Sequence, residues 1–154
     1  MNALVIYDST FGNTELIAQT IADTLADQGS VQLVQIHEAS SLDLEGADLL
    51  VLGCPTQRHK PTPAVQAFLG SISRRALQGL PAAAFGTRYR KARWLTGSAA
   101  RAIAKSLRKA GASLLLPGES FFVVGSEGPL EEGELQRARD WAREVTERFE
   151  AHCL

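Results

Sequence analysis

The first 25 residues contain the pattern that most constrains the fold: an apolar run, a short polar turn and a segment with helical spacing. Residues 3–7 read Ala-Leu-Val-Ile-Tyr, residues 8–14 read Asp-Ser-Thr-Phe-Gly-Asn-Thr, and Ile17, Ile21 and Leu25 follow. The apolar run predicts a buried strand, and the spacing after the turn predicts an amphipathic helix. The first N–H groups of a helix lack intrahelical partners, so a helix that starts directly after a strand offers an anion-binding site.

The side chains of this turn fit a phosphate group that is held without a cation. Ser9, Thr10 and Thr14 offer hydroxyl donors. Asn13 adds an amide, and Gly12 lets the backbone approach a ligand closely. The turn matches neither G-x-G-x-x-G, which argues against a dinucleotide pyrophosphate turn, nor the Walker A pattern. The same residue types also cap ordinary helices, and that interpretation stays open on the sequence alone.

The rest of the chain alternates between segments typical of strands and segments typical of helices. We expect strands over residues 3–7, 31–36, 48–53 and 81–86, and a fifth over 113–124 that is interrupted at 117–118. This alternation predicts an α/β fold, a three-layer α/β/α sandwich around a five-stranded parallel sheet, in a single domain over residues 1–154.

Four helices are expected between and after these strands. The first should run from about Asn13 to Gln28 and end at Gly29 in the left-handed conformation. The second should start at Pro63 after a Thr62 cap, and the third should cover residues 97–110. The last should begin near residue 130, where three glutamates suit its positive end: Glu131, Glu132 and Glu134.

Four stretches of the sequence resemble the flavodoxin family. The strongest is residues 7–14, in which Gly12-Asn13-Thr14 and the hydroxyls before them match the signature S/T-x-T-G-N-T. The weaker ones are 55–56 with 61–64, 95–100 and 128–134. The resemblance covers nearly the whole chain. It implies the strand order 2-1-3-4-5, the short-chain type without a long insertion in the fifth strand, and flavin mononucleotide (FMN) as cofactor.

A sheet of this order binds ligands beyond the carboxyl ends of its strands, so we expect the turns after strands one, three and four to form the site. The later turns are residues 54–61 and 87–96, both polar and longer than a simple connection needs. By resemblance, five residues hold the FMN phosphate: Ser9, Thr10, Gly12, Asn13 and Thr14. Six frame the isoalloxazine ring: Pro55, Thr56, Gln57, Thr87, Arg88 and Tyr89.

The ring also needs an aromatic or apolar lid, for which the candidates are Tyr89, Trp94 and Phe11. Arg58 is a further candidate, because a guanidinium stacks on aromatic rings. Ordinary packing under a loop remains the alternative for each aromatic. Better-known flavodoxins place an aromatic residue and a glycine in the turn after strand three, where this chain has Gln57 and Arg58. We therefore expect this turn to resist the peptide rotation that accompanies flavin reduction in the family.

The two later turns carry six permanent positive charges and one histidine, where the family usually has acidic residues. They are Arg58, His59, Lys60, Arg88, Arg90, Lys91 and Arg93. Cations near the ring would stabilise its anionic reduced form and make its reduction potential less negative. Two other interpretations stay open: a rim that docks an acidic or phosphate-bearing partner, and a merely solvated charged surface.

Composition narrows the class of protein. The net charge of -1 gives no global argument for nucleic acid or an acidic membrane. Without a secretion signal or an apolar stretch long enough to span a bilayer, we expect a cytoplasmic protein with reduced Cys54 and Cys153. Cys54 is expected to be a small buried residue. The three histidines are too scattered for a metal site, and no catalytic triad is visible.

The leading interpretation is an FMN-binding electron carrier, a monomer or weak dimer that meets a redox partner protein and binds neither nucleic acid nor membrane. The small size and the lack of an acid–base pocket favour a carrier over a catalyst. Two alternatives remain: an FMN-dependent reductase of quinones or other small acceptors, and a flavin-free binding module of the same fold.

Overall fold

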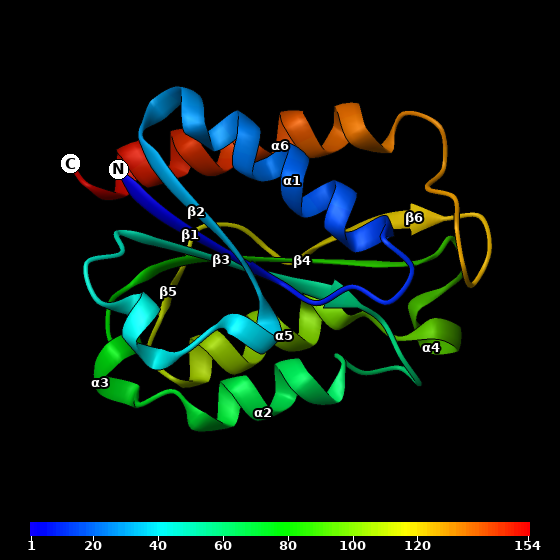
Figure 1. The fold of residues 1–154 in the computed structure, drawn as a ribbon, viewed down its shortest axis with the longest axis horizontal. Coiled ribbons are helices and arrows are strands. Elements are labelled where there is room, and N and C mark those ends of the chain that lie inside the picture. The colour runs from blue at the N-terminus through cyan, green and yellow to red at the C-terminus, as the bar shows by residue number, and fades with distance from the viewer.

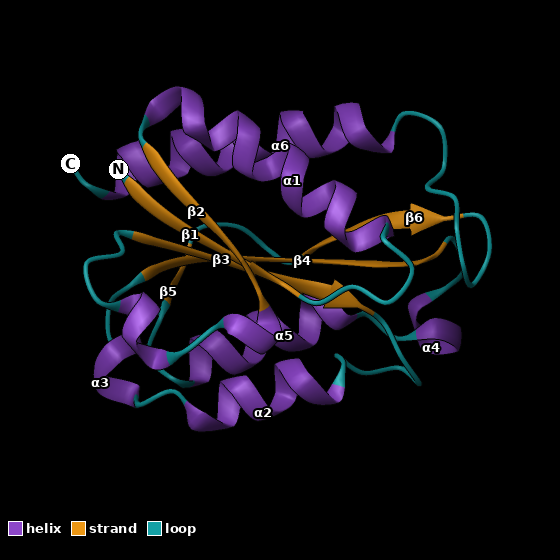
Figure 2. Ribbon diagram, viewed as in Figure 1, coloured by secondary structure: helices purple, strands orange, loops and turns teal.

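A parallel sheet lies between two layers of helices in the computed structural model, which describes residues 1–154 except the side chains of residues 41 and 42 (Figures 1 and 2). The strand order is β2-β1-β3-β4-β5, with β6 also paired to β4. The strands are β1 (Asn2–Tyr7), β2 (Ser30–Gln35), β3 (Leu49–Pro55), β4 (Pro81–Tyr89), β5 (Ser113–Leu114) and β6 (Glu119–Val123). The predicted α/β sandwich with order 2-1-3-4-5 is therefore confirmed.

Two pairs of helices cover the two faces of the sheet. Helices α1 (Asn13–Leu25) and α6 (Glu134–His152) lie on one face, and α2 (Pro63–Ser71) and α5 (Ala99–Lys109) lie on the other (Figure 1). Short helical turns complete the chain: α3 (Arg74–Leu77), α4 (Arg93–Thr96), η1 (Ala26–Gln28), η2 (Ile36–Glu38) and η3 (Ser41–Leu44).

The central strands are apolar because both of their faces are covered. In β1, Val5 packs into the core under α1 and α6, whereas its neighbour Ile6 packs into the core under α2 and α5. Alternate side chains of a strand point to opposite faces, so a strand between two helical layers needs a continuous apolar run. Residues 49–54 of β3 are all buried for the same reason.

The fifth strand consists of two pieces that pair with one neighbour. Leu114 of β5 lies opposite Ala82 of β4, and β6 continues along the same strand, with Phe121 opposite Thr87. Pro117 lies between the pieces, where a residue without an N–H cannot donate to the sheet. The predicted interruption is thus present. Strand β4 itself runs three residues further than expected, to Tyr89.

The end of the first helix differs from the prediction. Helix α1 ends at Leu25 and continues as the 3-10 turn η1 to Gln28. Gly29 has φ of 162°, an extended backbone and not the expected left-handed one. Its role is a close approach, because a Cβ there would lie 2.2 Å from the Met1 carbonyl oxygen.

The last helix begins at Glu134, four residues later than predicted. Leu130 instead bridges to Val123, and the Glu131 N–H donates to the Phe122 carbonyl, so this segment pairs with β6 and cannot be helical. Gly133 precedes the helix with a φ of 86°. The predicted Thr62 cap of α2 is correct: its hydroxyl accepts from the Val65 N–H.

Candidate functional site

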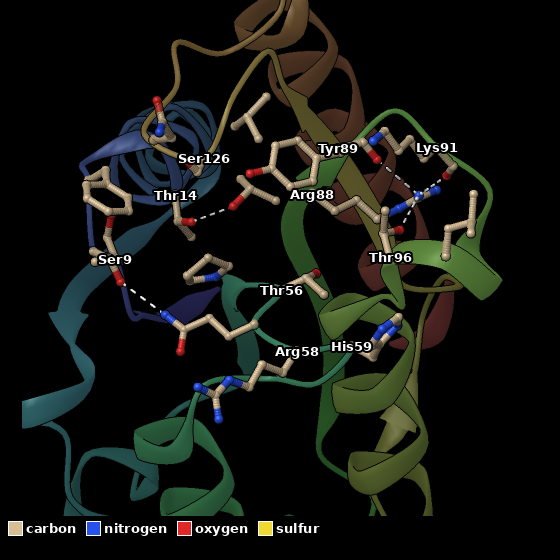
Figure 3. Close-up of a pocket in the computed structure, with 18 residues that line it drawn as sticks. Ser9, Thr14, Thr56, Arg58, His59, Arg88, Tyr89, Lys91, Thr96 and Ser126 are labelled. Atoms are coloured by element: carbon tan, nitrogen blue, oxygen red, sulfur yellow. Dashed lines mark hydrogen bonds between the residues drawn. The ribbon is translucent and has the colours of Figure 1, made fainter.

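A cavity of about 570 Å³ opens at the carboxyl ends of β1, β3, β4 and β6 (Figure 3). Twelve of the fourteen residues expected at the site line it: Ser9, Thr10, Phe11, Asn13, Thr14, Pro55, Thr56, Gln57, Arg58, Thr87, Arg88 and Tyr89. Gly12 and Trp94 do not line it. Cys54 and Pro55, expected in a turn, belong to β3, and residues 87–89 belong to β4, so the fold holds part of the site on rigid strands.

Residues 9–14 form a compact loop that leads into α1. Gly12, the residue before the helix, has a φ of 91°, which a glycine adopts without strain. The Ser9 Oγ accepts from the N–H groups of Gly12 (3.1 Å) and Glu15 (3.3 Å). In the described part of the chain, the N–H groups of Asn13 and Thr14 have no acceptor. The loop therefore presents free donors at the positive end of a helix.

One buried hydrogen bond connects this loop to β4. The hydroxyls of Thr14 and Thr87 lie 2.8 Å apart, and both side chains are almost fully buried while their residues line the cavity (Figure 3). Because each hydroxyl can donate and accept, the pair keeps the start of α1 fixed against the end of β4.

The turn after β3 is tightly closed. Gln57 and Lys60 exchange both backbone hydrogen bonds (2.8 and 2.9 Å), and the two residues between them, Arg58 and His59, have φ of 48° and 70°. This is the geometry of a type I′ turn, which normally selects asparagine and glycine. The turn packs against Gly97, where a Cβ would lie 2.4 Å from the His59 Cα.

Two side chains join this turn to its neighbours. The Thr56 hydroxyl accepts from the Ala99 N–H at the start of α5 (3.0 Å), and the Gln57 side-chain amide donates to the Thr10 hydroxyl (3.3 Å). In Figure 3, Arg58 and His59 lie on one side of the cavity and Tyr89 lies on the other. The cavity is thus bounded by polar turns and by aromatic residues from β4 and the first loop.

The Arg88 side chain forms hydrogen bonds within the turn that follows β4. Its Nη1 donates to the Lys91 carbonyl (2.7 Å) and to the Thr96 hydroxyl (3.3 Å), and its guanidinium lies over the Phe122 ring, 5.1 Å from the centroid. Burial lowers the pKa of Arg88, and the charges of Arg93 and Arg90 lower it further. Its Nε is buried and has no partner among the residues with described side chains.

The rim charges divide into three kinds. Arg58, His59, Arg88 and Lys91 line the cavity. Arg90 forms an ion pair with Glu131 (2.8 Å) and stacks on the Phe122 ring, 4.1 Å from its centroid. Lys60 and Arg93 are exposed outside the cavity. Trp94, a candidate lid, is 80 % exposed and does not line the cavity.

Four residues that line the cavity were not among the expected ones or in the predicted rim: Leu95, Thr96, Val123 and Ser126. Leu95 and Thr96 close the turn whose earlier residues were expected. Val123 and Ser126 follow from the topology, because β6 runs parallel to β4 and its carboxyl end reaches the same edge of the sheet. Only three strand ends were considered on the sequence, and applying the same rule to the fifth strand would have found them.

A reactive thiol, a metal site and a membrane span were considered for the part of the chain that the structure describes. Cys54 is buried outside the cavity, and burial raises the pKa of its thiol to about 12, although hydrogen bonds with Thr62 act in the opposite direction. The described residues include no cluster of His, Cys, Asp and Glu able to hold a metal ion. None of the described helices is both long and apolar enough to cross a bilayer.

Comparisons with known proteins agree with this geometry. A flavodoxin of Maridesulfovibrio salexigens is 29% identical over 128 residues, covering 80% of this chain and 86% of that protein. A flavodoxin of Nitratidesulfovibrio vulgaris is 37% identical over 59 residues, 36% of this chain and 38% of that protein. The solved structure of a flavodoxin from the domain Archaea superposes with a TM-score of 0.83 at 24% identity, over 97% of this chain and 99% of that one.

The sequence profile of the flavodoxin family matches residues 5–141, which include the carboxyl-terminal half of β1, the loop at 9–14 and all the later strands of the sheet. The chain therefore belongs to the flavodoxin family, whose members bind FMN and transfer electrons.

Proposed function

We propose that this chain carries electrons as a single domain in the cytoplasm, with FMN bound in the cavity at the carboxyl edge of the sheet. The observation that supports this most directly is the loop at 9–14, where the N–H groups of Asn13 and Thr14 have no acceptor and lie beside several hydroxyls. A phosphoryl group is an acceptor with a negative charge, which suits both the donors and the helix dipole. The cavity volume of about 570 Å³ is within the usual range for cofactor sites.

The donors of the loop fit the phosphoryl oxygens without a cation. The Ser9 hydroxyl accepts from Gly12 and Glu15, so a phosphoryl oxygen in its place would accept from the same N–H groups while Ser9 turns to donate. Thr10 and Thr14 supply further hydroxyls. Because Thr14 also bonds to Thr87, the phosphate end of the site is held in register with the ring end.

The isoalloxazine ring fits the wider part of the cavity, which Tyr89 and Phe11 border with aromatic surface and Thr56, Gln57 and Arg58 border with polar groups. The unpartnered Nε of Arg88 offers one more donor to an acceptor near that wall. When bound, the cofactor supplies the redox chemistry, and these residues orient it and exclude water.

The positive charges along the cavity set the expected reduction potential. Each cation near an anionic reduced ring stabilises it by about 1 kcal/mol at ~4 Å in water, and by more where water is excluded. Arg58, Arg88 and Lys91 line the cavity, so we expect a reduction potential less negative than that of flavodoxins with acidic rims. The same charges favour an acidic redox partner.

Titration with FMN and with riboflavin, which lacks the phosphate, tests this proposal. FMN should bind at least a hundredfold more tightly, because each charge-assisted hydrogen bond contributes about 1.5–3 kcal/mol. Thr14→Val should weaken FMN binding about tenfold or more by the same reasoning and weaken riboflavin binding less, because riboflavin has no phosphate for that hydroxyl to bind. Thr20→Val, the same change on a hydroxyl of α1 that bonds only to the Leu16 carbonyl, is the matched control and should alter neither.

Three outcomes would contradict the proposal. Equal affinity for FMN and riboflavin would show that the loop at 9–14 does not bind the phosphate. Failure to bind any flavin would show that the protein has no flavin cofactor and would favour a flavin-free binding module. Steady turnover of NADH with a quinone by the FMN-loaded protein would make it a reductase and not a carrier.

A further inference from the structure

The charges of this chain are segregated along the sequence. Residues 58–118 contain twelve Lys or Arg and no Asp or Glu, whereas residues 1–57 contain eight Asp or Glu and no Lys or Arg. The net charge of -1 conceals this separation. Where the fold gathers such a basic stretch on one surface, that surface orients charged partners before contact.

The fold places the main helices of the basic stretch on one side of the sheet. Besides β4 and β5, the stretch forms α2, α3, α4 and α5, of which α2 and α5 cover the face opposite α1 and α6 (Figure 1). Arg101, Lys105 and Arg108 of α5 are exposed and follow one another at intervals of four and three residues, on one face of the helix over about 10 Å. Among the residues with described side chains, Arg90 is the only one of the twelve in an ion pair.

These charges do not stabilise the helix that carries them. Arg101 and Lys105, and Lys105 and Lys109, are like charges four residues apart, an arrangement that destabilises a helix. Arg101 also lies in the first turn, where the helix dipole disfavours a cation, and that turn contains no acidic residue. Selection for stability alone would not produce this surface, so we look for its role outside the chain.

An exposed tryptophan adjoins the basic helix. Trp94 lies in α4, which ends three residues before α5 begins, and its side chain is 80 % exposed without lining the cavity. Arg93 precedes it and is also exposed. Tryptophan and arginine are the residue types most enriched among the energetic centres of protein interfaces. A large apolar side chain beside unpaired cations is therefore typical of a protein-docking surface.

We propose that an acidic redox protein docks on the surface formed by Arg93, Trp94 and the α5 residues Arg101, Lys105 and Arg108, called here the α5 docking surface. The inference rests on the proposed electron transfer, which requires a redox protein to approach the edge of the cavity. It adds the surface on which that redox protein docks. This surface begins at that edge, because Thr56 in the cavity wall bonds to the first residue of α5. On the other face, α1 and the turn after it expose Glu15, Asp23 and Asp27 and contain no Lys or Arg, so the same acidic partner is repelled there.

The test compares two double charge reversals that alter the net charge equally. Lys105→Glu with Arg108→Glu changes α5, and Arg139→Glu with Arg143→Glu changes α6 on the opposite face. The probe is a plant-type ferredoxin, an acidic [2Fe–2S] protein. Its association is followed by stopped flow from low to high salt, with cytochrome c as a basic control probe.

The α5 variant should slow ferredoxin association about tenfold at low salt, with the difference vanishing at about 0.5 M salt, because steering by exposed charges is screened. The α6 variant should change the rate less than about twofold, since its charges face away from the docked partner. Trp94→Ala should increase ferredoxin dissociation about tenfold, as expected for an interface centre. None of these variants should change FMN affinity, because none of the residues lines the cavity.

The same titrations with protein lacking FMN separate this inference from the proposed function. Failure to bind FMN would contradict the proposed function, while a preserved contrast between the two variants would still support the docking surface. Equal effects of the α5 and α6 variants would overturn the inference, as would an α5 variant that slows association with cytochrome c as much as association with ferredoxin. Salt-sensitive binding of a DNA duplex without ferredoxin binding would also overturn it and assign the surface to nucleic acid.

Discussion

Helices α5 and α6 cover opposite faces of one sheet but arrange their exposed charges in opposite ways. Along α6, acidic and basic residues pair at intervals of three or four: Glu134 with Arg137, Asp140 with Arg143, and Glu144 with Arg148. Along α5, every exposed charge is positive, and none is paired within the described part of the chain. The charged pairs of α6 have partners within the protein, whereas the charges of α5 are available to a partner outside it.

The beginning of α6 shows how far its charges are integrated into the fold. The Glu134 side chain is 4% exposed and accepts from the Phe122 N–H (2.8 Å) and from Arg137 (2.7 Å). Arg137 also binds Glu119 (2.8 Å) and lies over the Phe121 ring, 4.7 Å from its centroid. This network fastens α6 to β6, the strand whose end forms one wall of the cavity.

The largest effect should follow from Arg137→Met, which keeps the apolar stem and removes the charge. It leaves the Glu134 carboxylate buried with one N–H donor. Breaking a buried pair costs about 3–5 kcal/mol, but Arg137 is 36% exposed, so water screens part of the loss. We expect the free energy of unfolding to fall by about 2 kcal/mol, measured by urea denaturation.

The matched control is Lys105→Met on α5, which removes an exposed charge without a partner. It should not lower the free energy of unfolding, and relief of the repulsion from Arg101 and Lys109 should raise it by less than about 1 kcal/mol. Equal losses in the two variants would mean that the Arg137 network is no more important to the fold than a solvated lysine.

A smaller effect should appear in the pH dependence of stability. Burial alone would raise the pKa of Glu134, but the Arg137 and Phe122 hydrogen bonds and the charges of Arg137 and Arg90 together lower it below the usual value. A carboxyl with a lowered folded-state pKa contributes stability above the unfolded-state pKa and loses it as the pH falls through the folded-state pKa. The contribution of Glu134 is therefore present near neutral pH and disappears in acid.

Glu134→Gln tests this contribution. At pH 7 the variant should be less stable than the parent by about 1 kcal/mol, consistent with the loss of a charged hydrogen bond. The difference should shrink as the pH falls below about 4, measured by urea denaturation at each pH. A difference that stays constant down to pH 2 would show that the Glu134 charge makes no contribution of its own.

Local patterns predicted most of this fold. The apolar runs of β1 and β3, the Thr62 cap and the stripe of α5 each follow from residues close in sequence, and each is present. The cavity-lining position of the loop at 9–14 follows from the same reasoning, since parallel strands place their carboxyl ends at one edge.

Long-range contacts caused the departures. Residues 130–131 carry the composition of a helix start, but their backbone groups pair with β6, and this tertiary pairing outweighs local preference. The aromatic character of Trp94 suggested a lid, and only the course of α4 shows that its side chain lies outside the cavity. The burial of Glu134 could not be predicted either, because it depends on partners that only the fold brings together. The Phe122 N–H donates to Glu134, and Arg137 donates to Glu119 as well as to Glu134.

The smallest effect should be a gain of stability from Lys105→Glu on α5. The new carboxylate would lie four residues from both Arg101 and Lys109 and three from Arg108, and it would replace two repulsive pairs by attractive ones. Each replaced pair loses a repulsion and gains an attraction of about 0.2–0.5 kcal/mol each, so at the lower end of that range the free energy of unfolding should rise by somewhat under 1 kcal/mol at low salt. Arg143→Glu on α6 should lower it by a comparable amount, because that change breaks the pair with Asp140. Both effects should fade at about 1 M salt, where exposed charges are screened.

If Lys105→Glu stabilises the protein while slowing ferredoxin association, then Lys105 lowers the stability of the protein and favours docking. If it destabilises the protein, the charges of α5 have stabilising contacts of their own, and the contrast with α6 fails.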